Sequence, residues 1–386
     1  MRDAVVVGAV RSPVGRRNGG LAGLHPVDLS AQVLQGLVAR AGIEPGLVED
    51  VIWGCVTQVG EQGLNVGRQA VLAAGWPEEI PATTVDRQCG SSQQAVHFAA
   101  AGVVAGHYDV VVAGGVESMT RVPMFSNVVP GPGEHLSPGL RARYGDSLVP
   151  QGISAELIAE QWSITRDEAD RISLTSQERA AAARASGRFE AEIVPVTVPA
   201  DDGPVTLTSD EGIRPESSLE KLGALRPVFR ETGIVTAGNS SQISDGAAAL
   251  LITTSDVARR LNVQPLARLH AFSVVGVDPV TMLTGPVPAT QQVLDRAGLK
   301  LSDIGAFEIN EAFATVLSVW QREIGADPAL VNPNGGAIAL GHPLGASGAR
   351  LMTTLVHHMA ATGAQFGLQS MCEGAGMANA TILERL

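Results

Sequence analysis

Short apolar segments alternate along the chain with segments rich in alanine and leucine. The apolar segments contain almost no charged side chains, which is typical of buried β-strands, and they are residues 4–10, 51–53 and 110–113. The intervening segments carry apolar positions at helical spacing, and they are residues 27–41, 67–74 and 91–105. This alternation predicts an α/β fold with buried strands.

The pattern changes after Ser118. Residues 119–150 are rich in Pro, Gly, Ser and Arg and show no sustained period. A charged helical stretch over 155–185 and a short β segment over 193–208 follow, and the apolar α/β pattern resumes near Ser244. We therefore expect an inserted, partly folded subdomain here.

The second half of the chain echoes the first. A helical segment from Val33 ends at Ala-Gly and leads into a strand near Trp53, and a segment from Val293 ends at Ala-Gly and leads into a strand near Phe307. This separation is too long for a solenoid repeat, so it predicts a duplicated α/β domain packed face to face with its copy. Shared turn chemistry at a helix–Gly–strand connection is the alternative explanation.

Composition narrows the class of protein. The chain has 386 residues, of which 45% are hydrophobic and only 4% aromatic, so aliphatic side chains must fill more than one core. It contains no apolar run of about 18 residues, and its start resembles a strand rather than a signal peptide, so we expect a cytoplasmic protein without a membrane partner. A net charge of −12 argues against nucleic acid as the main partner.

The three cysteines differ in setting. Cys55, Cys89 and Cys372 show neither CxxC nor Cys/His ligand spacing, so we expect reduced thiols, no disulfide framework and no metal site. Cys89 lies where a β-branched run breaks at Cys-Gly before a helical stretch. The free N–H groups and the dipole of that helix would lower the pKa of its thiol, which predicts a nucleophile.

Four further segments place glycines and polar residues where strands should end. They are residues 235–242, 308–313, 332–348 and 370–377. Active sites of open α/β sheets form at such strand ends. Together with Cys89 these segments supply a histidine, a second thiol, a carboxamide and several glycine amides.

These segments resemble the thiolase family of acetyl-CoA C-acyltransferases along nearly the whole chain. The Cys89 segment, Asn-Glu-Ala-Phe from Asn310, Gly-His-Pro-Leu-Gly-Ala-Ser-Gly from Gly341 and Cys-Glu-Gly-Ala-Gly from Cys372 occur in the family's order. The resemblance implies an α/β thiolase fold with two duplicated domains in an αβαβα layering and an inserted loop subdomain. The implied division is residues 1–117 plus 244–265 for the N-terminal domain, 118–243 for the CoA-binding insertion and 266–386 for the C-terminal domain.

The resemblance also assigns catalytic roles. Cys89 would be the acylated nucleophile and His342 the base that activates it, whereas Cys372 would move a proton on the acetyl-CoA carbon. Asn310 would hold a water that forms one oxyanion hole with His342. The backbone N–H groups of Cys89 and Gly374 would form a second oxyanion hole. Such chemistry needs a soft nucleophile and a place for enolate charge.

Coenzyme A would be a substrate, and no permanently bound cofactor or metal is expected. The resemblance places Ala237 and Ser241 on the pantetheine wall and Arg214 near the nucleotide end, where phosphates need a cation. It places Met282, Ala312 and Phe313 along the tunnel. In related thiolases the region of the Cys89 segment lies near a dimer interface, so a homodimer or homotetramer is expected.

Two departures from the usual family pattern bear on the substrate. The chain has Pro150-Gln151 where many thiolases have His-Met, and it has Glu373 and Ala375 where the usual pattern has Ile and Gly. This version is similar to actinobacterial degradative thiolases, including those of steroid-ring breakdown. We therefore expect thiolytic cleavage of longer or bulkier 3-ketoacyl-CoA to acetyl-CoA or propionyl-CoA and a shortened acyl-CoA.

Other functions remain open at this point. A biosynthetic acetyl-CoA C-acetyltransferase would have the same site and form acetoacetyl-CoA by Claisen condensation. A ketoacyl synthase or hydroxymethylglutaryl-CoA synthase would share the nucleophilic cysteine and lack a second thiol at Cys372. A non-catalytic acyl-CoA-binding protein would be expected to have lost Cys89 or His342.

Overall fold

The computed structural model describes residues 2–129 and 131–386. Met1 and Pro130 lie outside the described residues, and Pro130 belongs to the stretch expected to be rich in loops. The strands are β1 (Val5–Arg11), β2 (Gly15–Arg16), β3 (Asp50–Gly54), β4 (Ala82–Val85), β5 (Val110–Ser118), β6 (Val196–Val198), β7 (Val205–Leu207), β8 (Ser244–Thr253), β9 (Ala267–Gly276), β10 (Ile304–Ile309), β11 (Phe366–Glu373) and β12 (Met377–Arg385). The helices are α1 (Pro26–Ala41), α2 (Val66–Ala73), α3 (Ser91–Ala105), α4 (Pro138–Tyr144), α5 (Gln151–Gln161), α6 (Arg166–Ala185), α7 (Leu219–Gly223), α8 (Ser255–Leu261), α9 (Pro286–Ala297), α10 (Ala314–Ile324), α11 (Ala337–Leu340) and α12 (Leu344–Thr362).

The main sheet joins two halves of the chain. Its order is β10-β11-β12-β9-β1-β8-β5-β3-β4, with β2 paired to β8. The two halves meet where β1 pairs with β9 through only two residue pairs, Val5 with Arg268 and Val6 with Ala267. In each half a parallel pair, β3 with β5 and β10 with β11, supplies strand ends that open to the same edge.

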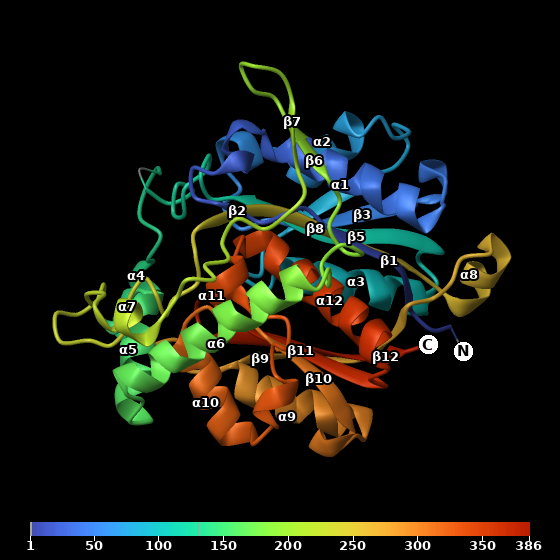
Figure 1. Ribbon diagram of the computed structural model, residues 1–386. Helices are drawn as coiled ribbons and strands as arrows, with labels where there is room; N and C mark the ends of the chain where they lie inside the picture. Colours follow the sequence, from blue (N-terminus) through green and yellow to red (C-terminus); the bar gives the residue numbers. More distant parts are fainter. Residues whose placement is uncertain (1, 130) are drawn as a thin grey trace.

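The elements stack in five layers (Figure 1). Helices α1 and α2 cover the outer face of the N-terminal strands, α9 and α10 cover the outer face of the C-terminal strands, and α3 and α12 lie between the two halves of the sheet. Side chains at the start of β1 alternate accordingly, because Val5 and Val7 pack in the outer core whereas Val6 and the preceding Ala4 pack against α3 and α12. The expected αβαβα layering is confirmed.

The internal duplication is visible in the topology. Helix α1 ends at Gly42 and α9 ends at Gly298, both glycines with φ of 66° in the left-handed region. A 3₁₀ turn and a strand follow each glycine, β3 in the first half and β10 in the second. Later in each half, α3 leads into β5 and α12 leads into β11. Helices α3 and α12 therefore occupy equivalent positions in the two halves.

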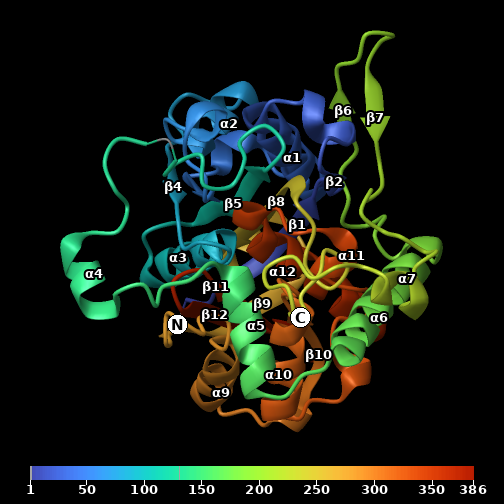
Figure 2. The same cartoon turned by 90° about the vertical axis from the view of Figure 1, so that its left-hand side faces the viewer.

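Between β5 and β8 the chain leaves the main sheet and forms its own helices and a hairpin. Strands β6 and β7 pair and project from one side of the molecule, whereas α4 projects from another (Figure 2). The helical stretch expected over 155–185 is observed as two helices, α5 and α6, separated by a turn. Ser163 has a positive φ of 51° in this turn, and the Thr165 side chain caps α6.

A buried ion-pair cluster fastens this region to the main sheet. Arg11 of β1 is fully buried, and its guanidinium contacts Glu192 Oε1 at 2.6 Å and Asp210 Oδ1 and Oδ2 at 2.7 and 2.9 Å. Glu192 also accepts a hydrogen bond from Thr354 of α12. The cluster therefore connects β1, the region between β5 and β8, and α12. Among the described residues no helix is both long and apolar enough to cross a bilayer.

Replacing Arg11 by alanine would leave Glu192 and Asp210 buried without their cation. We expect Arg11→Ala to lower the free energy of unfolding by about 3–5 kcal/mol, the cost of breaking a buried pair from one side. Urea denaturation followed by circular dichroism measures this loss. Arg171→Ala is the control, since Arg171 pairs with Asp167 on the exposed surface and its loss should cost much less, because solvent screens the pair. Equal losses in the two variants would contradict the expectation.

Candidate active site

Cys89 lies in a tight loop between β4 and α3. Gln88, directly before it, has a positive φ of 49°, a conformation that side chains other than glycine rarely adopt. The loop is held by Asp86 Oδ1, which accepts the Gln88 N–H at 2.6 Å, and by the Ser91 hydroxyl, which donates to the Gln88 carbonyl at 2.6 Å. Strain of this kind is concentrated at functional sites.

His342 occupies the matching place before α12, and close glycine packing brings the two helix starts together. A Cβ on Gly54 would lie 2.4 Å from Ser92 N of α3 and 2.8 Å from the Gly345 carbonyl of α12. A Cβ on Gly348 would lie 2.4 Å from Gln93 N. The first turns of α3 and α12 are therefore in direct contact.

The ends of β10 and β11 complete the site. The Asn310 N–H donates to the Ser370 carbonyl at 3.0 Å, which places Asn310 beside the end of β11, and its Nδ2 lies 3.3 Å from His342 Nε2. The N–H groups of Gly374 and Cys89 both contact the Cys89 sulfur. Cys372 lies on β11, and it is close enough to Cys89 for the charge of Cys89 to raise the pKa of the Cys372 thiol. The structure thus brings the five predicted catalytic residues into one region.

The hydrogen bonds of His342 define its protonation. The Ser347 hydroxyl donates to the Pro343 carbonyl, so its oxygen accepts from His342 Nδ1–H. His342 Nε2 then accepts from the Asn310 amide. Burial lowers the pKa of His342 to about 3, and the positive charge of Arg350 is a second, smaller cause. His342 is therefore a neutral imidazole whose Nε2 lone pair points toward Asn310.

The expected low pKa of the Cys89 thiol is wrong in this structure. Burial, followed by the Glu373 charge, raises the pKa of Cys89 to about 12, whereas the contacts from Gln151 and the backbone N–H groups lower it. Only 4% of Cys89 is exposed, so loss of hydration outweighs the helix terminus. This geometry therefore supports transfer of the Cys89 thiol proton to a base, rather than a Cys89 that is permanently ionised.

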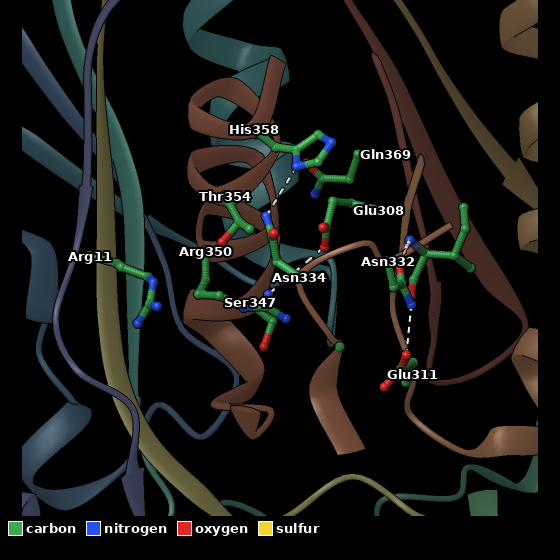
Figure 3. A network of polar contacts seen from close by, with 12 residues as sticks. Arg11, Glu308, Glu311, Asn332, Asn334, Ser347, Arg350, Thr354, His358 and Gln369 are labelled. Atoms are coloured by element: carbon green, nitrogen blue, oxygen red, sulfur yellow. Dashed lines mark hydrogen bonds and ion pairs between the residues drawn. The ribbon is translucent and has the colours of Figure 1, made fainter. Parts of the chain in front are cut away.

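A buried polar layer includes Ser347, the hydrogen-bond partner of His342 Nδ1 (Figure 3). Arg350 and Thr354 project from α12 toward Glu308 of β10 and the Arg11 cluster, and Arg350 Nη1 lies 4.0 Å from Glu308 Oε2. Burial raises the pKa of Glu308 to about 8. Glu311 accepts hydrogen bonds from Ser176 and Asn332, so it orients its neighbours.

The predicted CoA-binding residues fall into two neighbouring groups. Arg214 and Ala237 line a cavity of about 310 Å³ together with Lys221 and Gln242. The Gln242 carbonyl accepts the His342 N–H at 3.4 Å, so the cavity lies next to the His342 loop.

The second group reaches the thiols. Met282, Ala312 and Phe313 pack in one apolar cluster with Cys372. The Ser241 N–H donates to the Ala312 carbonyl at 2.9 Å.

Sequence reasoning missed three residues of this site. Gln151 was noted only as a departure, yet its side chain hydrogen-bonds the Cys89 thiol. Lys221 is a second cation in the cavity of Arg214 and shows no motif around it. Glu373 was noted as a carboxylate beside Cys372, and nothing in the sequence indicated that it also lies against Gly90. Among the described residues no group of three or more His, Cys, Asp or Glu side chains could hold a metal ion.

Comparison with known proteins identifies the family. The family model of the thiolase N-terminal domain matches residues 4–256, and that of the thiolase C-terminal domain matches residues 263–385. The chain is 51% identical to the steroid 3-ketoacyl-CoA thiolase FadA6 of Mycobacterium tuberculosis, over 100% of this chain and 95% of that protein. It is 46% identical to the 3-ketoacyl-CoA thiolase of Erwinia tasmaniensis, with both proteins covered completely.

A solved structure extends the agreement to the fold. The crystal structure of the Bacillus anthracis acetyl-CoA acetyltransferase superposes with a TM-score of 0.92 at 38% sequence identity, covering 100% of this chain and 99% of that chain. Matching family models at both ends, relatives matched along their whole length and a shared layered fold agree with the thiol, imidazole and carboxamide geometry of the site. The chain belongs to the thiolase family and is an acyltransferase.

Proposed function

We propose that the protein cleaves 3-ketoacyl-CoA with CoA, giving acetyl-CoA or propionyl-CoA and a shortened acyl-CoA. The observation that carries this proposal is the convergence of two thiols with a neutral histidine, Cys89 and Cys372 with His342. One thiol can hold the acyl group while the other moves a proton. The names of the relatives, 3-ketoacyl-CoA and steroid 3-ketoacyl-CoA thiolases, support a degradative direction and a bulky acyl group.

The first half-reaction begins at Cys89. His342 Nε2 accepts the thiol proton, and the sulfur attacks the 3-keto carbon. The N–H groups of Cys89 and Gly374 lie at the sulfur and would bind the resulting oxyanion. The C2–C3 bond then breaks, leaving an acyl thioester on Cys89 and the enolate of acetyl-CoA.

The enolate requires both a charge partner and a proton. Asn310 and His342 form a polar pair at the site, and a water on Asn310 would complete an oxyanion hole for the thioester oxygen. Cys372 donates its proton to the enolate carbon. Burial and the Cys89 charge hold the pKa of Cys372 well above its usual value, which keeps this proton available. CoA thiol then gives its proton to the Cys372 thiolate and attacks the acyl thioester. Cys89 leaves as a thiolate and takes its proton back from His342, which completes a ping-pong cycle.

Binding of CoA is proposed to use both groups of predicted residues. Arg214 and Lys221 would bind phosphates in their shared cavity, and Ala237 and Ser241 would line the pantetheine. Met282, Ala312 and Phe313 would line the tunnel to the thiols. The region over 118–243 would act as the CoA-binding domain between an N-terminal domain (1–117 plus 244–265) and a C-terminal domain (266–386).

We also propose a cytoplasmic homodimer or homotetramer. Strand β4 is the end strand of the main sheet, and its side chains are only partly buried. Leu64, in the loop before α2, is 94% exposed. An edge strand near an exposed leucine suits pairing with a second copy of the chain.

Thiolysis of a panel of 3-ketoacyl-CoAs, from acetoacetyl to steroid-derived, tests the proposed function. We expect kcat/KM to rise from acetoacetyl-CoA to the bulkier substrates, and intact-protein and peptide mass spectrometry to find the acyl group on Cys89. Cys89→Ala should show neither. Selective use of acetoacetyl-CoA, or efficient condensation of acetyl-CoA, would favour the acetyl-CoA acetyltransferase alternative. A stable adduct only on Cys55 or Cys372 would contradict the nucleophile.

Cys372→Ala should separate acylation of Cys89 from the steps that move a proton on the acetyl carbon. Cys89 should still accept an acyl group from acyl-CoA, since that step needs no proton on the acetyl carbon. Exchange of acetyl-CoA α-hydrogens with D₂O, and cleavage of 3-ketoacyl-CoA, should fall by about 10²- to 10⁴-fold, mainly in kcat. Nuclear magnetic resonance follows the exchange. Exchange within a few-fold of the parent would show that Glu373, Glu311 or His342 moves the proton.

Arg214→Ala and Lys221→Ala test the cavity. Each should raise the KM for CoA by roughly 5- to 20-fold, as expected for loss of one charge-assisted hydrogen bond of about 1–2 kcal/mol, with little change in kcat. Substrates shortened to the pantetheine thioester should show no such increase. Lys300→Ala is the control, because Lys300 is exposed and lies outside the cavity. An equal effect on shortened substrates would exclude a role in phosphate binding.

A further inference from the structure

Glu373 is a buried carboxyl group next to the two thiols of the site. It directly follows Cys372 on β11 and is fully buried. Within residues 2–129 and 131–386 neither of its oxygens has a hydrogen-bond partner. A Cβ on Gly90 would lie 1.9 Å from Glu373 Oε1, so the carboxyl packs against the backbone next to Cys89. Buried carboxyl groups are normally paired, so this one calls for an explanation.

The groups around Glu373 come from three elements. The loop before α3 contributes Asp86, Arg87 and Cys89, and β11 contributes Cys372. Strand β12 contributes the neutral Asn379, whose amide donates to the Gly90 carbonyl at 3.2 Å. Arg87 supplies the favourable charge, although its Nη1 contacts Met377 Sδ at 3.8 Å. Burial raises the pKa of Glu373 to about 8, with Arg87 lowering it and Asp86 raising it.

The charge of Glu373 acts on two of the three thiols. It raises the pKa of both Cys89 and Cys372, the two thiols of the site. Cys55 is also buried, but the carboxylates that raise the pKa of its thiol are Glu117 and Asp86. Like charges in one dry pocket oppose each other's ionisation. The pocket therefore accommodates one negative charge more easily than two.

We propose that Glu373 is a positioning residue that controls the ionisation of the two active-site thiols. With the carboxyl protonated, Cys89 carries the negative charge after its proton passes to His342. With the carboxyl ionised, formation of the Cys89 thiolate is suppressed. No co-reactant is needed, because the only exchange is of a proton between Glu373 and solvent. The inference rests on the proposed function only for the identity of the nucleophile.

The sign of the pH effect follows from the raised pKa. Glu373 is protonated below about pH 8 and loses its proton above it. In the parent protein, the rate of Cys89 alkylation by iodoacetamide should rise with pH and then flatten above about pH 8, as the new carboxylate opposes the thiolate. Peptide mass spectrometry measures alkylation of Cys55, Cys89 and Cys372 separately, without any acyl-CoA.

Removing the Glu373 carboxylate should make the Cys89 thiol easier to ionise. Glu373→Gln should make Cys89 alkylation at pH 9 about tenfold faster, the change in thiolate fraction for a pKa lowered by one unit. Glu373→Met should act in the same direction, which excludes a new hydrogen bond from the Gln side chain as the cause. Cys55 in the same digest is the internal reference and should react at the parent rate. Thermal melting checks that each variant is folded.

Glu308→Gln is the matched control variant. Glu308 is a second fully buried carboxyl whose pKa is raised to about 8, and it faces Arg350 rather than the thiols. Its replacement should leave the pH profile of Cys89 alkylation unchanged.

An unchanged Cys89 profile in both Glu373 variants would overturn the proposal, as would equal acceleration of Cys55. If neither Glu373 variant folds, a parent profile that keeps rising without flattening above pH 8 would overturn it. Absence of thiolysis in the substrate panel would instead reject the proposed function and leave the alkylation result standing.

Discussion

The contact between the first turns of α3 and α12 is the constraint on which the rest of the structure depends. Two copies of an α/β unit can bury their inner helices together only if the helix starts approach within backbone distance. A Cβ on Gly348 of α12 would lie 2.4 Å from Gln93 N of α3, so this position has no room for a side chain. Because each helix start carries one catalytic side chain on the residues before it, Cys89 and His342 come to the same place from the two halves.

Burial of that junction determines the electrostatics of the site. Cys89, Cys372, Asn310 and His342 are all at least 96% buried, and loss of hydration is the largest cause of each thiol and imidazole pKa shift. The unliganded site therefore disfavours a thiolate–imidazolium pair. Prearranged N–H donors at the sulfur offset this cost only when negative charge develops on the substrate, which suits a site complementary to a transition state.

The region between β5 and β8 is attached to the sheets by buried charge as well as by apolar packing, since Val194, Val196 and Val198 belong to the core of the N-terminal strands. Arg11 joins β1 to Glu192 and Asp210, and Glu156 of α5 accepts the Ile234 and Val235 N–H groups at 2.9 Å. These contacts hold α5, and with it Gln151, over Cys89. The cavity of Arg214 and Lys221 lies on the same region, next to the His342 loop. The region between β5 and β8 thus contributes to both ends of the proposed substrate path.

The sequence by itself determined the elements and the order of the chemical groups. The buried apolar run of β1, the glycine stops at Gly42 and Gly298, and the loop ending at Cys89 depend on local spacing and turn chemistry, and local rules predicted them. The sequence pattern did not predict the break between α5 and α6, because the charged pattern continues across the turn. Only the positive φ of Ser163 in the structure reveals this break. What tertiary structure alone decided is burial. The high pKa of the Cys89 thiol, the contact of Gln151 with its sulfur, and the buried carboxyl of Glu373 all arise where segments far apart in sequence exclude water together, and no local pattern records how much water is excluded.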